Sequence, residues 1–267
     1  MEAIDVAILT MNSERMLKEC VNSVYKNVPI RNLIVVDGFS TDATVSIVKE
    51  FQEKYGNVKF VQEKGTRGKA RQTAIQLVKT EWFMFVDSDV VLSKNWFAKA
   101  EKFVNDDVGA IWGIEIWSVL KGAKILKLFE RMTLKIFEQR GGTHDILIRR
   151  KTVEDIQIPP HLHTYEDGFI KSWIEKKGFK VLGVYEPYCF HFRPDTVWSV
   201  NNNVGCVVSD LKYAIYRPVL LLSYGFYSAI VIYQIVSNKF NKTSRFLKPI
   251  LIQESIGRVN YQIVPMT

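Results

Sequence analysis

Short, almost continuous apolar runs alternate with amphipathic segments through residues 1–115, and this alternation limits which folds the chain can adopt. Four runs are predicted to be strands buried on both faces: Ile4–Leu9, Leu33–Val36, Val58–Val61 and Trp82–Val86. Three segments with apolar residues at helical spacing lie between or beside them: 14–26, about 40–55 and 69–79. We expect the second helix to begin at Ser40 or Thr41 and to end at Gly56. Strand–helix–strand alternation predicts an α/β fold with a mostly parallel sheet covered by helices.

The rest of the chain divides into two further stretches, 116–200 and 201–267. The first has mixed signals: a helix at about 121–138, a break at 141–143, a strand at Asp145–Ile148, a helix after Glu166 and a strand at Val181–Tyr185. The second contains an uncharged apolar segment from Pro218 to Asn238. We therefore expect one large domain followed by a helical appendage of different character.

Composition narrows the class of protein. Hydrophobic residues make up 47% of the chain and charged residues 24%, which is typical of a folded globular protein. The net charge of +8 favours an anionic partner: nucleic acid, a membrane surface or a phosphorylated small molecule.

The cysteines are odd in number and widely spaced, at Cys20, Cys189 and Cys206, so neither a zinc site nor a disulfide framework is predicted. The N-terminal residues lack a signal-peptide pattern, so we expect the first domain in the cytoplasm.

Two carboxylates follow the fourth predicted strand directly. In Asp87-Ser88-Asp89, alternation along an extended segment allows both acidic side chains to point the same way. Ligands of parallel α/β sheets bind at the carboxyl ends of strands. Two hard oxygen ligands at this place suit Mg²⁺ or Mn²⁺ together with substrate phosphates. The alternative is a solvated turn with a helix N-cap, in which Asp is equally common.

Two more loops carry candidate binding groups. Asp37 ends the second predicted strand, where a carboxylate can accept hydrogen bonds from a base or a ribose, although Ser40 and its neighbours also fit a turn and an N-cap. The segment Lys64–Arg71 contains two glycines and four basic residues before a helix, which suits a diphosphate. An ordinary basic loop is the alternative, and the spacing of a P-loop is absent.

The order of these motifs resembles glycosyltransferase family 2, whose members have the GT-A fold. Four segments carry the resemblance: Val6–Asn12, Val35–Asp42, Gly68–Gln72 and Val86–Asp89. It continues more loosely through Gly141-Gly142-Thr143, Tyr165-Glu166-Asp167 and His191. The resemblance implies that 1–115 is a nucleotide-sugar-binding half, that 116–200 is the acceptor half of the same GT-A domain, and that Mg²⁺ or Mn²⁺ is the cofactor.

The resemblance also assigns roles to single residues. It places Asp37 against the nucleoside, Asp89 on the metal and Asp87 beside it. The other residues that it implies near the donor are Thr10, Asn12, Lys69 and Arg71. Gln72 stands where the family usually has Asn, and Phe39 is inserted into the usual Asp-Gly-Ser pattern. Neither departure removes a charged ligand.

Glu166-Asp167 matches the acidic motif of the acceptor site. A hydroxyl acceptor needs a general base, for which Asp167 is the first candidate and Glu166 the second; capping of the following helix is the structural alternative. With no second candidate nucleophile, we expect direct displacement with inversion of the anomeric centre. A neutral His191 imidazole could complete the metal shell or contact the diphosphate, and the alternative is a packed or surface histidine. His144, His161 and His163 receive no role.

One missing motif and the C-terminal stretch bear on the acceptor and on where in the cell the protein acts. The Q-x-x-R-W motif of processive synthases is absent, which favours a single sugar addition. Residues 218–238 are long enough to span a bilayer, and four cations follow within ten residues: Lys239, Lys242, Arg245 and Lys248. We expect this stretch to hold the enzyme on the cytoplasmic side of a membrane, near a glycan or a polyprenyl or other lipid-linked acceptor. A homo-oligomer that buries the same segment is the alternative.

Three other classes of protein are weighed against a glycosyltransferase. A nucleotidyltransferase carries its G-x-G-T-R loop after the first strand, whereas Gly65-Thr66-Arg67 follows the third. Nucleic-acid binding would explain the charge, but no reader motif occurs, and paired acids at a strand end oppose it. A non-catalytic nucleotide-sugar-binding protein would be expected to lose a carboxylate, yet Asp37, Asp87, Asp89 and Asp167 are all present.

Overall fold

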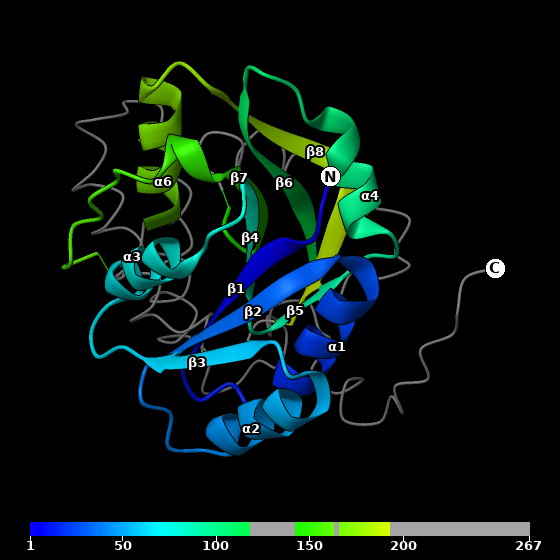
Figure 1. Cartoon of the computed structure of the whole chain (residues 1–267), viewed down its shortest axis with the longest axis vertical. Helices are drawn as coiled ribbons and strands as arrows, with labels where there is room; N and C mark the ends of the chain where they lie inside the picture. The colour runs from blue at the N-terminus through cyan, green and yellow to red at the C-terminus, as the bar shows by residue number, and fades with distance from the viewer. Residues whose placement is uncertain (118–141, 163–165, 193–267) are drawn as a thin grey trace, which may run out of the picture.

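The computed structural model describes residues 1–117, 142–162 and 166–192, and its strands form one sheet with helices on both faces (Figure 1). The strands are β1 (Ile4–Thr10), β2 (Ile30–Asp37), β3 (Val58–Gln62), β4 (Trp82–Asp87), β5 (Val90–Leu92), β6 (Val108–Trp117), β7 (Asp145–Arg149) and β8 (Lys180–His191). The helices are α1 (Leu17–Asn27), α2 (Thr44–Tyr55), α3 (Arg67–Leu77), α4 (Trp96–Ala100) and α6 (Glu166–Lys176), with short 3-10 turns at Glu101–Phe103 and Arg150–Thr152. All four strands predicted in 1–115 are present.

The sheet has the strand order β3-β2-β1-β4-β7-β6-β8-β5. The first four strands are parallel, as the alternation of strands and helices predicts. Beyond them the sheet is mixed, because β7 runs antiparallel to β4 and to β6, while β8 is parallel to β6 and antiparallel to β5. Strands from residues 1–115 and from the second stretch therefore belong to the same sheet, which is the mostly parallel α/β architecture expected.

The hydrophobic core lies on the two faces of this sheet. Alternate residues of β1 point to opposite faces: Val6 and Ile8 pack with residues of α1, α2 and α4, whereas Ala7 packs with residues of α3 and α6. Figure 1 shows α1 and α2 together on one side of the sheet and α3 and α6 on the other. The central strands are thus buried on both faces, which explains their continuous apolar sequence.

Two helix boundaries differ from those expected. Helix α2 begins at Thr44 rather than at Ser40 or Thr41, because the Asp42 carboxylate accepts a hydrogen bond from Thr44 N (3.0 Å) and holds the preceding residues in a turn. Gly56 ends that helix in the left-handed conformation, with φ of 71°, as predicted. Helix α3 starts two residues before the expected position, and Thr66 Oγ1 caps it by accepting from Lys69 N.

Several expectations from the sequence fall outside the described residues. The predicted helix at 121–138 and the whole stretch 201–267 lie there, as does His163. Among the residues that are described, no helix is both long enough and apolar enough to cross a bilayer. The short elements β5 and α4 and the long strand β6 were not anticipated.

Candidate active site

The candidate site begins where three parallel strands end at one edge of the sheet. The register pairs Thr10 of β1 with Asp37 of β2, and Leu9 of β1 with Asp87 of β4. Three polar side chains from distant parts of the sequence therefore share the carboxyl edge, the usual position of ligands in parallel α/β sheets. The sequence-based placement of Asp37 and Asp87 at strand ends is thus realised in three dimensions.

Asp37 organises the loop that follows β2. Its carboxylate accepts hydrogen bonds from Thr10 Oγ1 (2.9 Å), from Ser40 N (2.9 Å) and Oγ (2.5 Å), and from Gln62 Nε2 (3.2 Å). Burial by itself would raise the pKa of Asp37, but these hydrogen bonds favour the charged form, and the net effect lowers it. The fully buried carboxylate is an anion held by neutral donors from two strands, β1 and β3, and from the loop at Ser40.

The loop after β1 is tied to the loop after β2. Asn12, which has a positive φ of 51°, donates from its backbone N–H to Ser40 Oγ (2.8 Å) and accepts from Thr41 N through its side-chain oxygen (2.9 Å). Ser13 Oγ lies 2.9 Å from Ser88 Oγ, which links the first loop to the Asp87–Asp89 turn. These contacts hold the three loops of the carboxyl edge as one unit.

The two basic candidates of the Lys64–Arg71 segment occupy different surroundings. Lys69 pairs with Glu63 (2.7 Å) at the surface. Arg71 is buried, and its Nη2 donates to Asp87 Oδ1 (2.8 Å) and to Thr143 Oγ1 (2.7 Å). The Nε and Nη1 atoms of Arg71 have no hydrogen-bond partner among the described residues. Of the two cations, Arg71 is the one that directly contacts Asp87, the last residue of β4.

The pKa of Asp87 falls to about 2. Burial acts in the opposite direction, but the positive charge of Arg71 and the charge of nearby His191 outweigh it. Asp87 is therefore an anion at neutral pH and is available as a hard oxygen ligand.

His191 approaches Asp89 through strand pairing that the sequence does not reveal. Strand β8 runs antiparallel to β5 and places His191 opposite Val90, the residue after Asp89. His191 Nε2 lies 3.0 Å from Asp89 Oδ1, and Nδ1 lies 2.6 Å from Glu115 Oε2. Glu115 comes from β6, is buried and fixes the orientation of the imidazole ring.

Asp87, Asp89 and His191 form a group that fits a divalent ion. Each offers one ligand atom, and these atoms lie within 4.8 Å of one another. Two carboxylate oxygens and one imidazole nitrogen, with remaining places for substrate oxygens, suit Mn²⁺ or Mg²⁺. The buried contact between Glu115 and His191 is the kind of outer support that orients a metal-binding histidine.

The acidic pair Glu166-Asp167 opens helix α6. Glu166 is buried, whereas Asp167 is more exposed and accepts from Gly168 N (2.7 Å). Burial and the negative charge of Asp167 raise the pKa of Glu166 to about 7, against the opposing effects of Arg71 and Arg67. A carboxyl group that titrates near neutral pH is well suited to general-base catalysis.

The sequence assigned no role to two residues of the site, Glu115 and Thr143, and the structure gives Gln72 a hydrogen-bonding role outside it. Glu115 is a charged residue in the otherwise apolar strand 114–116, which was an available signal. Thr143 lies in the glycine-rich break, and only the fold shows that it contacts Arg71. Gln72 has a packing role, because its side chain bonds Ile156 O (3.1 Å) and Ile158 N (2.8 Å). His161 lies in an exposed turn.

Comparison with solved structures identifies the architecture as the GT-A type of glycosyltransferase. A mannosyltransferase from Pyrobaculum calidifontis, solved with GDP-Man and Mn²⁺, has a TM-score of 0.65 at 18% identity over 89% of this chain and 75% of that one. Residues 1–349 of Staphylococcus aureus TarS, solved with UDP-GlcNAc, give a TM-score of 0.58 at 20% identity over 96% of this chain and 78% of that one. At these identities the likeness concerns the fold.

The chain belongs to glycosyl transferase family 2, whose model matches residues 5–149. A similar curated protein is the poly(ribitol-phosphate) beta-glucosyltransferase of Bacillus spizizenii, 36% identical over 204 residues, which are 69% of this chain and 32% of that protein. The poly(ribitol-phosphate) beta-N-acetylglucosaminyltransferase TarS of Staphylococcus aureus is 34% identical over 112 residues, covering 40% of this chain and 19% of that protein. The chain thus spans a third or less of the length of these two relatives.

Proposed function

We propose that the protein transfers a sugar from a nucleoside diphosphate donor to an acceptor hydroxyl, with a divalent ion held by Asp87, Asp89 and His191. The convergence of these three side chains beside Arg71 at the carboxyl edge carries the proposal. Family membership supports the activity, and it argues against the nucleotidyltransferase and nucleic-acid alternatives. When bound, the ion would stabilise the negative charge that develops on the leaving diphosphate.

The protein side chains then have distinct tasks in the proposed reaction. Asp37 and its loop lie at the edge where the nucleoside would bind, together with Thr10 and Asn12. Arg71 keeps unpaired donor nitrogens among the described residues, and its positive charge favours phosphate oxygens. Asp167 or Glu166 would accept the proton of the acceptor hydroxyl as its oxygen attacks the anomeric carbon. Direct attack from the face opposite the diphosphate inverts that carbon.

We further propose a polyol-phosphate chain as the acceptor, presented near a membrane. Two curated relatives are named for action on poly(ribitol-phosphate), and a third, from Staphylococcus epidermidis, is a teichoic acid poly(glycerol phosphate) polymerase. The net charge of +8 complements such a polyanion. A lipid-linked or other glycan acceptor is the second candidate, supported by the uncharged segment 218–238 and the cations after it.

A donor panel with product analysis tests the proposed activity. Purified full-length protein, an excess of Mn²⁺ or Mg²⁺ and α-linked UDP- and GDP-sugars would be incubated with poly(ribitol phosphate), poly(glycerol phosphate) or a lipid-linked glycan. We expect one donor to yield a β-linked product, identified by NMR of the anomeric proton. A retained α-linkage would contradict inversion. The absence of both sugar transfer and donor hydrolysis, with every donor tested, would contradict the enzymatic function.

Membrane attachment through residues 218–248 is a separate proposal with its own test. Removal of the residues after Arg217 is expected to release the protein from the membrane fraction and to reduce activity on a membrane-bound acceptor more than donor affinity. Each cation near an anionic surface contributes about 1 kcal/mol to attachment. Fractionation of lysed cells without detergent provides the measurement. Full-length protein that stays in the high-speed supernatant as a discrete oligomer would instead support burial of the segment between subunits.

A further inference from the structure

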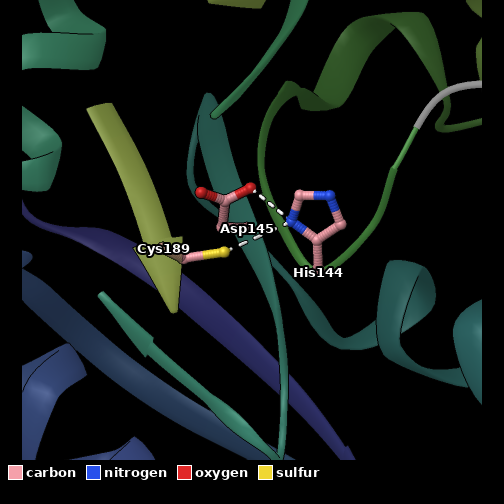
Figure 2. A group of neighbouring side chains, drawn as sticks. All are labelled: His144, Asp145 and Cys189. Carbon is pink, nitrogen blue, oxygen red and sulfur yellow. Dashed lines mark hydrogen bonds and ion pairs between the residues drawn. The ribbon is translucent and has the colours of Figure 1, made fainter. Parts of the chain in front are cut away.

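A second group of ligand-type side chains lies in the core, apart from the Asp87–Asp89–His191 group. His144, Asp145 and Cys189 point toward one another, and the contacts drawn in Figure 2 converge on one ring nitrogen of His144. Asp145 begins β7, His144 precedes it and Cys189 belongs to β8. Their three ligand atoms lie within 4.8 Å of one another. Asp145 and Cys189 are fully buried, and His144 is 8% exposed.

The polar atoms of this group contact chiefly one another. His144 Nδ1 lies 2.7 Å from Asp145 Oδ1 and 3.5 Å from Cys189 Sγ. His144 is thus the close partner of Asp145 Oδ1, although this approach does not have the geometry of a regular hydrogen bond. A fully buried carboxylate is costly unless a cation lies beside it, and either a protonated His144 or a bound metal ion can supply that charge. The other oxygen, Oδ2, accepts from Trp96 Nε1 (2.8 Å), which fixes the orientation of the carboxylate.

Two glycines provide the space in which these side chains meet. Strands β7 and β8 are not neighbours, because β6 lies between them. A Cβ atom on Gly113 of β6 would lie 2.5 Å from Asp145 Oδ2 and 2.6 Å from Pro187 O. A Cβ atom on Gly142 would lie 2.6 Å from His144 Nε2. The backbone is therefore shaped so that side chains from two separated strands reach each other across the middle one.

We propose that His144, Asp145 and Cys189 form a second metal site, which binds a borderline-soft divalent ion of the Zn²⁺ class. One imidazole nitrogen, one carboxylate oxygen and one sulfur are ligands that Zn²⁺ accepts together, whereas a thiolate disfavours Mg²⁺ and Mn²⁺. Three protein ligands leave one position of a tetrahedral ion for water. The hydrogen bond from Trp96 is the outer support that such sites use.

The ion would link parts of the chain that present the donor-site residues. His144 follows Thr143, the partner of Arg71, and its carbonyl accepts from Asp87 N (3.0 Å). Cys189 lies two residues before His191. Cys189 would coordinate an ion as the thiolate, so binding would release its proton to solvent. Binding of an ion by this group does not depend on the glycosyltransferase reaction.

Cobalt(II) in place of zinc provides a readout that is specific for the thiolate ligand. Chelator-treated full-length protein titrated with Co²⁺ is expected to bind about one equivalent with a sulfur-to-cobalt charge-transfer band. Cys189→Ser should lose the band, whereas Cys20→Ser and Cys206→Ser, the matched controls, should keep it. Asp89→Asn should also keep it, which separates this site from the proposed donor-site ion. Zn²⁺ should displace Co²⁺ and raise the melting temperature of the wild type.

Asp145→Asn preserves side-chain size and supplies a second test if Cys189→Ser does not fold. Loss of this ligand should weaken Co²⁺ binding at least about tenfold, by analogy with the effect of disturbing even the outer partners of metal ligands. A wild type without the charge-transfer band would overturn the proposal, and so would a Cys189→Ser variant that keeps the band. Loss of Co²⁺ binding in Asp89→Asn together with unchanged binding and no sulfur band in Cys189→Ser would assign the ion to the donor site instead.

Discussion

Asp89→Asn is expected to reduce sugar transfer by at least about two orders of magnitude, because stabilisation of a leaving group by a bound ion contributes several kcal/mol. The substitution keeps the size of a partly exposed side chain, so the fold should be retained. It removes the negative charge 3.0 Å from His191 Nε2, and with it one of the three proposed ligands. Steady-state kinetics over a Mn²⁺ titration, together with donor affinity from calorimetry, provide the measurement.

A matched substitution controls for the loss of charge as such. Asp106→Asn changes an exposed acidic residue in the turn before β6, and it should leave both activity and the dependence on Mn²⁺ unchanged. Full activity of Asp89→Asn, or of the wild type in excess chelator, would refute the metal-dependent mechanism while leaving family membership intact.

The acidic pair at the start of α6 is expected to set the pH dependence of the reaction. A general base acts in its deprotonated form, and the pKa of Glu166 is raised to about 7. If Glu166 is the base, kcat/KM should be high above about pH 7 and should fall as the pH drops through that value. Glu166→Gln should then lower kcat by about 10²–10⁴-fold, the usual contribution of a positioned base. The carboxyl groups of Glu166 and Asp167 interact, so the apparent pKa values read from the pH profile belong to the pair rather than to either residue.

Asp167→Asn distinguishes the two candidates for the base. Removal of the neighbouring negative charge lowers the pKa of Glu166, so the pH profile should move to lower pH with activity largely kept if Glu166 is the base. If Asp167 is the base, as its match to the family motif favours, the same variant should lose about 10²–10⁴-fold in kcat. Glu53→Gln, on the exposed side of α2, is the control. Unchanged kcat and pH profiles in both site variants would remove the pair from the mechanism.

These experiments test contacts between residues that are far apart in the chain, and the periodicity of the sequence does not predict such contacts. The pattern of buried runs predicted β1 to β4 and their parallel arrangement, because a strand covered on both faces must be apolar throughout. The same reasoning placed Asp37 and Asp87 at strand ends. It gave no indication of β5, whose three residues are too few for a periodic signal, and it did not anticipate the antiparallel insertion of β7.

The sequence by itself determined the family, the α/β class and the candidate ligands Asp87 and Asp89, since these depend on local motifs and on the order in which they occur. Only the tertiary structure decided which distant side chains join them. His191 meets Asp89 because β8 pairs with β5, and Arg71 rather than Lys69 reaches Asp87 because it lies on the buried face of α3. The buried group of His144, Asp145 and Cys189 likewise depends on Gly113 in an intervening strand. Such contacts arise from the pairing of strands remote in the chain, where no fixed sequence spacing exists for a motif to record.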